Sequence, residues 1–157
     1  NDCKYGHDIK EDTMRLSLLK SATDPDYSAD YGTHEFTYSL YPHSEEWYNS
    51  GLEEEAFDLN SPVVVLDGAS ALGNESLISF DAKNIVLDAF KKAENEEAYV
   101  LRFHEYTGRR GRLTLTTGLK FDSWCEADLM ENPLGEWKHT AIEVEVKPYE
   151  IKTIMLK

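Results

Sequence analysis

The sequence predicts an all-β protein with one short helix, and three observations support this fold class. Apolar residues recur at every second position in many short runs, which is the period of a half-buried strand. The runs follow one another at a spacing of about 8–12 residues, as in sandwich-type packing. Only the stretch near residues 45–59 has helical periodicity instead.

Two strands are expected in the first part of the chain. Apolar and polar side chains alternate over residues 13–18 and again over residues 34–40. The segment between them, residues 24–32, is rich in Asp, Pro and Gly and is expected to form a loop. It is long for a hairpin connection, and long loops are often functional.

The expected helix follows. Ser44 can cap its N-terminus, and two glutamates in its first turn complement the helix dipole. Asn60 followed by Pro62 is expected to end it. Its apolar stripe consists of Tyr48, Leu52, Ala56 and Leu59.

A stretch rich in Gly, Ala, Ser and Asn, residues 68–75, is expected to be a linker between two β units, residues 1–67 and 76–157. The second unit has the length of a small β-sandwich. Its predicted strands contain Ile85–Ala89, Tyr99–Phe103, Leu113–Thr116, Ile142–Val146 and Ile151–Leu156. Arg109–Gly111 lies between two of these patterns and is expected to be a hairpin turn.

The first unit has too few strands to close a core of its own. We therefore expect it to be the end of a larger sheet, and the missing initiator Met also suggests that the chain is a piece of a longer protein.

Composition excludes several classes of partner. The formal net charge of −14 repels phosphate backbones and anionic lipid, so neither nucleic acid nor a membrane is an expected partner. No run approaches the ~20 apolar residues of a membrane span. Cys3 and Cys125 lie far apart without a CxxC spacing, which favours free thiols in a cytoplasmic protein.

The histidines do not have metal-ligand spacing. His34 and His43 are separated by a full strand, and adjacent residues such as His34 and Glu35 point to opposite faces of a strand. No metal site is therefore expected in this chain, and His34 is expected to be half-buried with its hydrogen bonds satisfied.

Other features have two open interpretations. Five aromatic residues could stack on sugar rings, but the alternative places Trp47 on the packing face of the helix and Trp124 in the second core. Arg109 and Arg110 could dock another domain or form a solvated tip, and Asn74–Ser76 matches the N-glycosylation pattern, as chance also allows. The five aromatic residues are Tyr27, Tyr31, Trp47, Trp124 and Trp137.

The order of several sequence blocks resembles that of family 38 glycoside hydrolases, the α-mannosidases, of the bacterial and cytosolic type. The resemblance covers nearly the whole chain, except residues 68–79. The blocks that carry it are Asn1–Ile9, Met14–Ser21, Asp24–Pro25, Gly32–Tyr38, Leu40–His43, Val100–Tyr106 and Lys147–Thr153.

The resemblance implies a retaining, zinc-dependent α-mannosidase whose nucleophile and zinc ligands lie in an N-terminal α/β domain. Residues 1–67 would then be the end of a β super-sandwich, and residues 76–157 a terminal β-sandwich. No catalytic residue and no metal ligand is carried over to this chain, because no position matches those motifs. The implied partner is the N-terminal catalytic domain of the same chain.

One segment is expected to approach the α-mannoside substrate. The loop before the first strand, residues 1–6, combines polar, charged and aromatic groups, and such loops often carry function. Asn1, Asp2 and Tyr5 are the substrate-proximal candidates; alternatively, they only anchor the loop through hydrogen bonds. Two other functions stay open, an independent carbohydrate-binding module and a structural domain that forms homo-oligomers.

Overall fold

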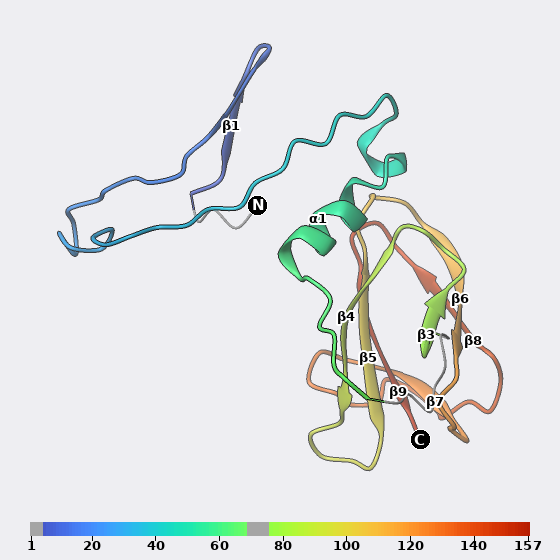
Figure 1. Cartoon of the computed structure of the whole chain (residues 1–157). Coiled ribbons are helices and arrows are strands. Elements are labelled where there is room, and N and C mark those ends of the chain that lie inside the picture. Colours follow the sequence, from blue (N-terminus) through green and yellow to red (C-terminus); the bar gives the residue numbers. More distant parts are fainter. Residues whose placement is uncertain (1–4, 69–75) are drawn as a thin grey trace. The chain divides into compact units, whose positions relative to one another are not determined.

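The computed structural model of the protein describes residues 5–68 and 76–157. The chain divides into two compact units, residues 1–67 and residues 68–157 (Figure 1). The predicted all-β fold class is confirmed, since the described secondary structure is mostly antiparallel strands with one short α-helix.

The second unit is a sandwich of two antiparallel sheets (Figure 1). One sheet has the strand order β3–β6–β8, and the other has the order β4–β5–β9–β7. The strands are β3 (Ile78–Phe80), β4 (Ile85–Lys92), β5 (Tyr99–Glu105), β6 (Gly111–Thr117), β7 (Trp124–Ala127), β8 (Ile142–Val146) and β9 (Ile151–Leu156). All five strands predicted for this unit are confirmed. The two that were missed, β3 and β7, are too short for alternation to reveal them.

The core of the second unit lies between its two sheets. Alternate residues of the longer strands point inward, so the period of two in the sequence becomes one buried face per sheet. The buried cluster consists of Leu101, Phe103, Leu113, Leu115, Trp124, Ile142, Val144, Val146, Ile154 and Leu156. A smaller buried cluster includes Val100, Cys125 and Met155, which alternate with residues of the first cluster and so lie on the outer face of the four-stranded sheet.

The predicted hairpin turn at Arg109–Gly111 is wrong. Strand β5 pairs with β4 on one side and with β9 on the other, so no edge of β5 is left for β6. Strand β6 instead pairs with β3 and β8 in the other sheet. The segment 106–110 therefore crosses from one sheet to the other.

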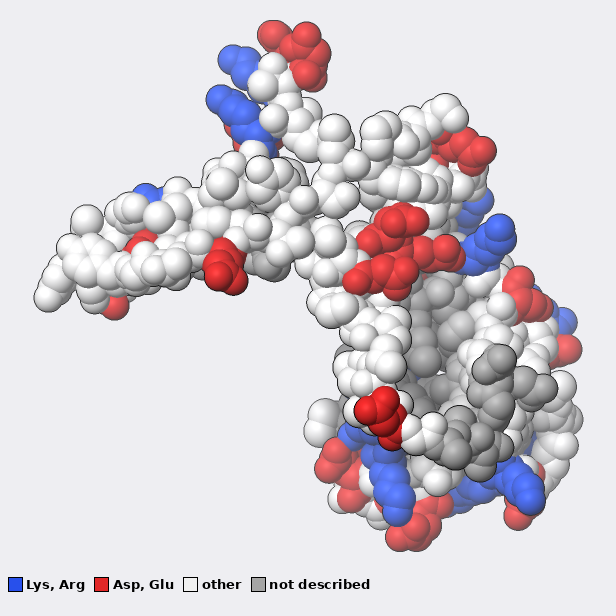
Figure 2. Space-filling view, in the orientation of Figure 1, with Lys and Arg blue, Asp and Glu red and all other residues white. Residues whose placement is uncertain are grey.

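The first unit contains a β-hairpin and two short helical segments. Strands β1 (His7–Lys10) and β2 (Thr13–Leu16) pair antiparallel. A 3₁₀ turn, η1 (Trp47–Asn49), precedes α1 (Leu52–Asn60). The expected helix start at Ser44 is wrong, because Gly51, with a φ of 75°, adopts a left-handed conformation at the N-cap of α1. The glutamates of the first turn are Glu53–Glu55, and Figure 2 shows acidic side chains gathered over α1.

Residues 34–40 do not form the strand that their alternation predicts. A strand needs a neighbour for its backbone hydrogen bonds, and the described residues provide none for this segment. Among residues 5–67, the buried class contains only Asp30. The assignment of this unit to the end of a super-sandwich stays a prediction.

Candidate functional site

Tyr5 is joined to Asp30, which is 25 positions away in the sequence. The Tyr5 hydroxyl donates to the Asp30 carboxylate, at 2.8 Å from Oδ2 and 3.0 Å from Oδ1. The backbone N–H of Ser21 donates to the same carboxylate at 2.7 Å. His34 is half-buried, and its Nε2 lies 3.0 Å from the Asp30 carbonyl oxygen. Asp30 thus links the segment before β1, through Tyr5, to Ser21 and His34, which lie on either side of the loop 24–32.

The three substrate-proximal candidates have different outcomes. Asn1 and Asp2 lie outside the described residues. Tyr5 is half-buried and has a hydrogen-bond partner, which fits the anchoring alternative as well as a place beside substrate. Asp30, which completes this cluster, was not predicted, because nothing in a sequence shows that a loop aspartate will be buried.

The aromatic residues fall into two groups. Trp124 is buried in the core, where its Nε1–H donates to the Thr140 carbonyl, so the core interpretation is confirmed. Trp137 is half-buried beneath the Lys157 ammonium.

Trp47 lies in η1 and is 44% exposed, so its expected place on a helix packing face is wrong. Tyr27 and Tyr31, in the loop around Asp30, are exposed and meet edge to face, with ring centroids 6.4 Å apart.

A second polar cluster surrounds Glu105 at the end of β5. This fully buried carboxylate accepts hydrogen bonds from the Asn84 side chain and from the backbone N–H groups of Thr107, Gly108 and Tyr149. Burial by itself would raise the pKa of Glu105, but hydrogen bonds from the Thr107 hydroxyl, the Tyr149 backbone N–H and the Asn84 side chain lower it to about 2. Glu105 therefore holds the crossing segment 106–108 and the turn before β9 in fixed positions.

A hollow of about 640 Å³ lies on the outer face of the four-stranded sheet, beside Glu105. Arg102 and His104 of β5 and Asp88 of β4 provide its polar lining. The Nδ1–H of His104 donates to the Asp88 carboxylate at 2.9 Å. Leu129, Tyr149 and Ile151 provide apolar surface around this centre.

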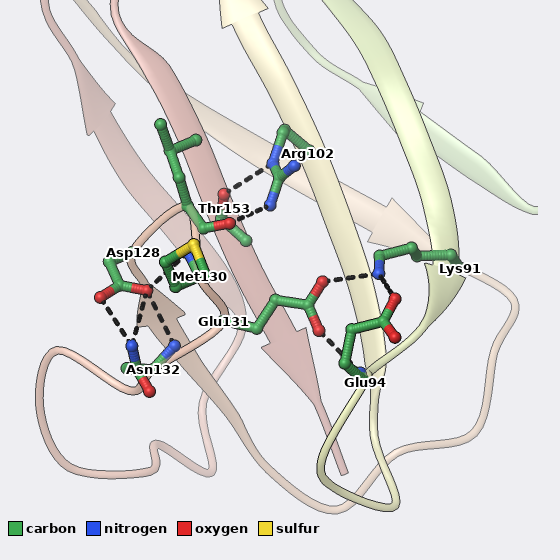
Figure 3. Close-up of polar contacts among 9 residues, drawn as sticks. Lys91, Glu94, Arg102, Asp128, Met130, Glu131, Asn132 and Thr153 are labelled. Carbon is green, nitrogen blue, oxygen red and sulfur yellow. Dashed lines mark hydrogen bonds and ion pairs between the residues drawn. The ribbon is translucent and has the colours of Figure 1, made fainter.

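Leu129, in the loop 128–132, lines the hollow. Hydrogen bonds and an ion pair join this loop to the sheet (Figure 3). Arg102 donates to the Leu129 carbonyl at 3.0 Å and to the Thr153 hydroxyl at 3.1 Å. Glu131 pairs with the Lys91 ammonium at 2.7 Å and accepts from the backbone N–H of Glu94 at 2.8 Å. Inside the loop, the Asp128 carboxylate accepts from two backbone N–H groups (Figure 3).

Residues 5–68 and 76–157 contain no group of three or more His, Cys, Asp or Glu side chains that could hold a metal ion. Burial raises the pKa of the Cys125 thiol, and Cys3 lies outside the described residues, as do Asn74 and Glu75 of the glycosylation pattern. In the same described ranges, no helix combines the length and the apolar character needed to cross a bilayer.

The fold of the second unit is that of a two-sheet antiparallel β-sandwich domain. Residues 84–154 match the sequence family described as the glycosyl hydrolases family 38 C-terminal beta sandwich domain. The chain therefore carries a family 38 C-terminal β domain, and the family resemblance seen in the sequence is confirmed.

Similar proteins extend the match to the whole chain. Alpha-mannosidase G of Dictyostelium discoideum is 31% identical over 163 residues, which are 98% of this chain and 15% of that protein. Alpha-mannosidase 2C1 of Homo sapiens is 31% identical over 165 residues, 99% of this chain and 16% of that protein. An alpha-mannosidase of Saccharomyces cerevisiae is 29% identical over 182 residues, which are 99% of this chain and 17% of that protein. The chain thus spans 15–17% of the length of these relatives.

Proposed function

We propose that the chain is the non-catalytic C-terminal β region of a retaining, zinc-dependent α-mannosidase that hydrolyses terminal α-mannosides in the cytoplasm. The observation that carries this proposal is the extent of the similarity. Proteins named as α-mannosidases in an amoeba, a mammal and a yeast align with 98–99% of the chain. Because the alignments span both units, both are assigned to the same enzyme.

The first unit is proposed to pack against the catalytic domain. Apolar side chains that would normally be buried are exposed here, including Ile9 at 70% and Leu40 at 79%. The four consecutive apolar residues 63–66 are each at least 80% exposed. Exposed apolar surface of this extent is typical of a surface that another protein region covers.

Zinc is assigned to the catalytic domain and not to this chain. The described residues do not fit a zinc site, since they lack a cluster of three suitable ligands.

The isolated chain tests the non-catalytic assignment. We expect no hydrolysis of an aryl α-mannoside by residues 1–157, with or without added zinc. Turnover above the buffer blank, lost when the chain is heat-denatured, would contradict it.

The loop that contains Tyr5 is proposed to complete the active site. Tyr5→Phe keeps the ring but removes the hydrogen bond to Asp30, and Tyr5→Ala removes both. In the full-length enzyme we expect both variants to lower kcat/KM by about tenfold, because a misplaced loop weakens transition-state contacts. Tm should fall only slightly, because the Ser21 backbone N–H still donates to Asp30.

Tyr27→Phe is the matched control, since Tyr27 is exposed in the same unit. It should keep the wild-type kcat/KM. If both Tyr5 variants lower Tm and leave kcat/KM unchanged, the loop only anchors the structure and its role beside substrate is wrong.

Self-association is a second candidate, favoured by the same exposed apolar residues. Light scattering on the isolated chain distinguishes self-association from packing against the catalytic domain. A stable oligomer that persists on dilution, in both the isolated chain and the full-length enzyme, would assign this surface to a second copy and not to the catalytic domain.

A further inference from the structure

The hollow on the second unit has a polar centre, Asp88 and His104, which come from the paired strands β4 and β5. The pairing of β4 with β5 shifts register between Leu87 and Ala89, so Asp88 lies at a β-bulge. Bulges commonly re-aim a side chain beside a functional site. At this bulge, the Asp88 carboxylate accepts a hydrogen bond from the Nδ1–H of His104. Both side chains are about one-third exposed, so they can still contact a ligand.

The rim of the hollow is apolar and exposed. Leu129 is 59% exposed, Tyr149 is 68% exposed and Ile151 is 54% exposed. These residues come from the 128–132 loop, the turn before β9 and the first position of β9, so separate elements contribute to one apolar ring. A single exposed apolar residue is ordinary, but three around one polar centre indicate a site.

The walls are fixed before any ligand binds. Arg102 holds the Leu129 carbonyl, and the buried Glu105 holds the backbone N–H of Tyr149. Tyr149 has a φ of 57°, which disfavours any residue with a β-carbon, and such strain is concentrated at functional positions. A β-carbon at Gly108 would lie 2.6 Å from the Tyr149 hydroxyl oxygen, so glycine there leaves room for the ring.

The chemistry of this lining selects an amphipathic ligand. Asp88 and His104 bond to each other, but a purely apolar ligand would bury their remaining hydrogen-bonding capacity without partners, which is unfavourable. A simple anion would face the Asp88 carboxylate, and the two negative charges would repel each other. A sugar ring presents C–H groups on one face and hydroxyls around its edge, and it can satisfy both kinds of surface. The volume falls in the range of about 300–1,000 Å³ that is usual for small-molecule sites.

We propose that this hollow binds one hexopyranose unit of a glycan, with an apolar face of the sugar on the Tyr149 ring and its hydroxyls hydrogen-bonded to Asp88 and His104. The site is distinct from the Tyr5–Asp30 cluster, which lies in the other unit. The use of a mannoside as the first probe rests on the proposed function. The assignment of the hollow as a sugar site rests on its lining residues alone.

The test is an NMR titration of the isotope-labelled 157-residue chain with methyl α-mannopyranoside, methyl α-glucopyranoside and methyl α-galactopyranoside. We expect saturable shifts of the amide signals of Arg102, His104 and Tyr149 with at least one of them. A Kd on the order of millimolar is expected for a single sugar unit.

Two variants locate the binding. Tyr149→Gly removes the ring and accepts the positive φ without strain, so it should weaken binding by at least about tenfold. Asp88→Asn keeps the shape but removes the charged acceptor, and should weaken binding by about fivefold or more. The matched controls Tyr27→Ala and Asp58→Asn change exposed residues of the other unit and should leave Kd unchanged.

Absence of saturable shifts with all three sugars would overturn the proposal, and so would binding that survives both variants. If Tyr149→Gly fails to fold, Asp88→Asn alone decides. Loss of sugar binding in the full-length enzyme, together with protection of these amides from hydrogen exchange, would assign the hollow to a protein interface. Binding of glucoside but not mannoside would support the hollow and count against the proposed substrate class.

Discussion

Glu105 is a carboxylate at a position where the strand pattern places an apolar side chain. Leu101, Phe103 and Glu105 share the inward face of β5, and all three are fully buried. A buried charge is tolerated only when hydrogen bonds replace its water, and backbone N–H groups of two segments do so here. An inward-facing carboxylate in an alternating run is the signal that could have revealed this cluster.

The stability of the second unit should depend on the ionisation of Glu105. Its pKa is lowered from 4.5 to about 2, so the stabilisation is complete above about pH 5 and is lost as the pH falls from 4.5 towards 2. Glu105→Gln should lower the free energy of unfolding at pH 7 by roughly 2–3 kcal/mol. Urea denaturation followed by tryptophan fluorescence at several pH values measures both effects.

Glu145→Gln is the control, because Glu145 is exposed on β8. It should keep the wild-type stability and pH profile. The Glu105→Gln variant should lose part of the pH dependence below pH 5; a profile parallel to that of the wild type would show that Glu105 does not contribute the stabilisation.

At the scale of elements, each strand depends on its neighbours more than on its own pattern. Residues 34–40 alternate as clearly as those of β8, yet only β8 is a strand, because β6 provides its hydrogen-bond partners. The helix shows a related effect, since Gly51 in a left-handed conformation separates η1 from α1 within one apolar stripe.

The 128–132 loop should depend on Glu131. Its side chain is only 7% exposed and joins the Lys91 ammonium and the Glu94 backbone N–H (Figure 3). Glu131→Gln removes one of the two carboxylates that pair with the Lys91 ammonium, the other being Glu94, and should weaken the attachment of the loop to β4. Hydrogen exchange of the loop amides should accelerate while exchange in β8 stays unchanged.

Glu136→Gln, at an exposed position further along the same connection, is the control and should leave loop exchange as in the wild type. Equal acceleration across β8 and the loop would instead indicate global destabilisation and contradict a local role for Glu131.

At the scale of the molecule, the two units differ in how they are stabilised. The second has a core between two sheets, whereas Asp30 is the one buried residue among positions 5–67. Leu101→Ala, in the core, should therefore lower the free energy of unfolding by about 2–5 kcal/mol. Leu40→Ala should change it by no more than about 0.5 kcal/mol in this chain.

Denaturant unfolding of both variants measures this contrast. In the full-length enzyme, Leu40→Ala should become destabilising, since the proposed catalytic domain would cover Leu40. An unchanged stability of the full-length variant would count against that packing.

The sequence by itself determined the all-β class, five of the seven strands of the second unit and the family, because the period of two and the family blocks are local properties of the chain. Tertiary structure decided the rest. It assigned β5 and β6 to different sheets, left residues 34–40 without a strand partner, and brought Tyr5 to Asp30 and Asp88 to His104. These outcomes depend on which distant segments become neighbours, and hydrogen-bond partners that are far apart in the chain leave no local pattern.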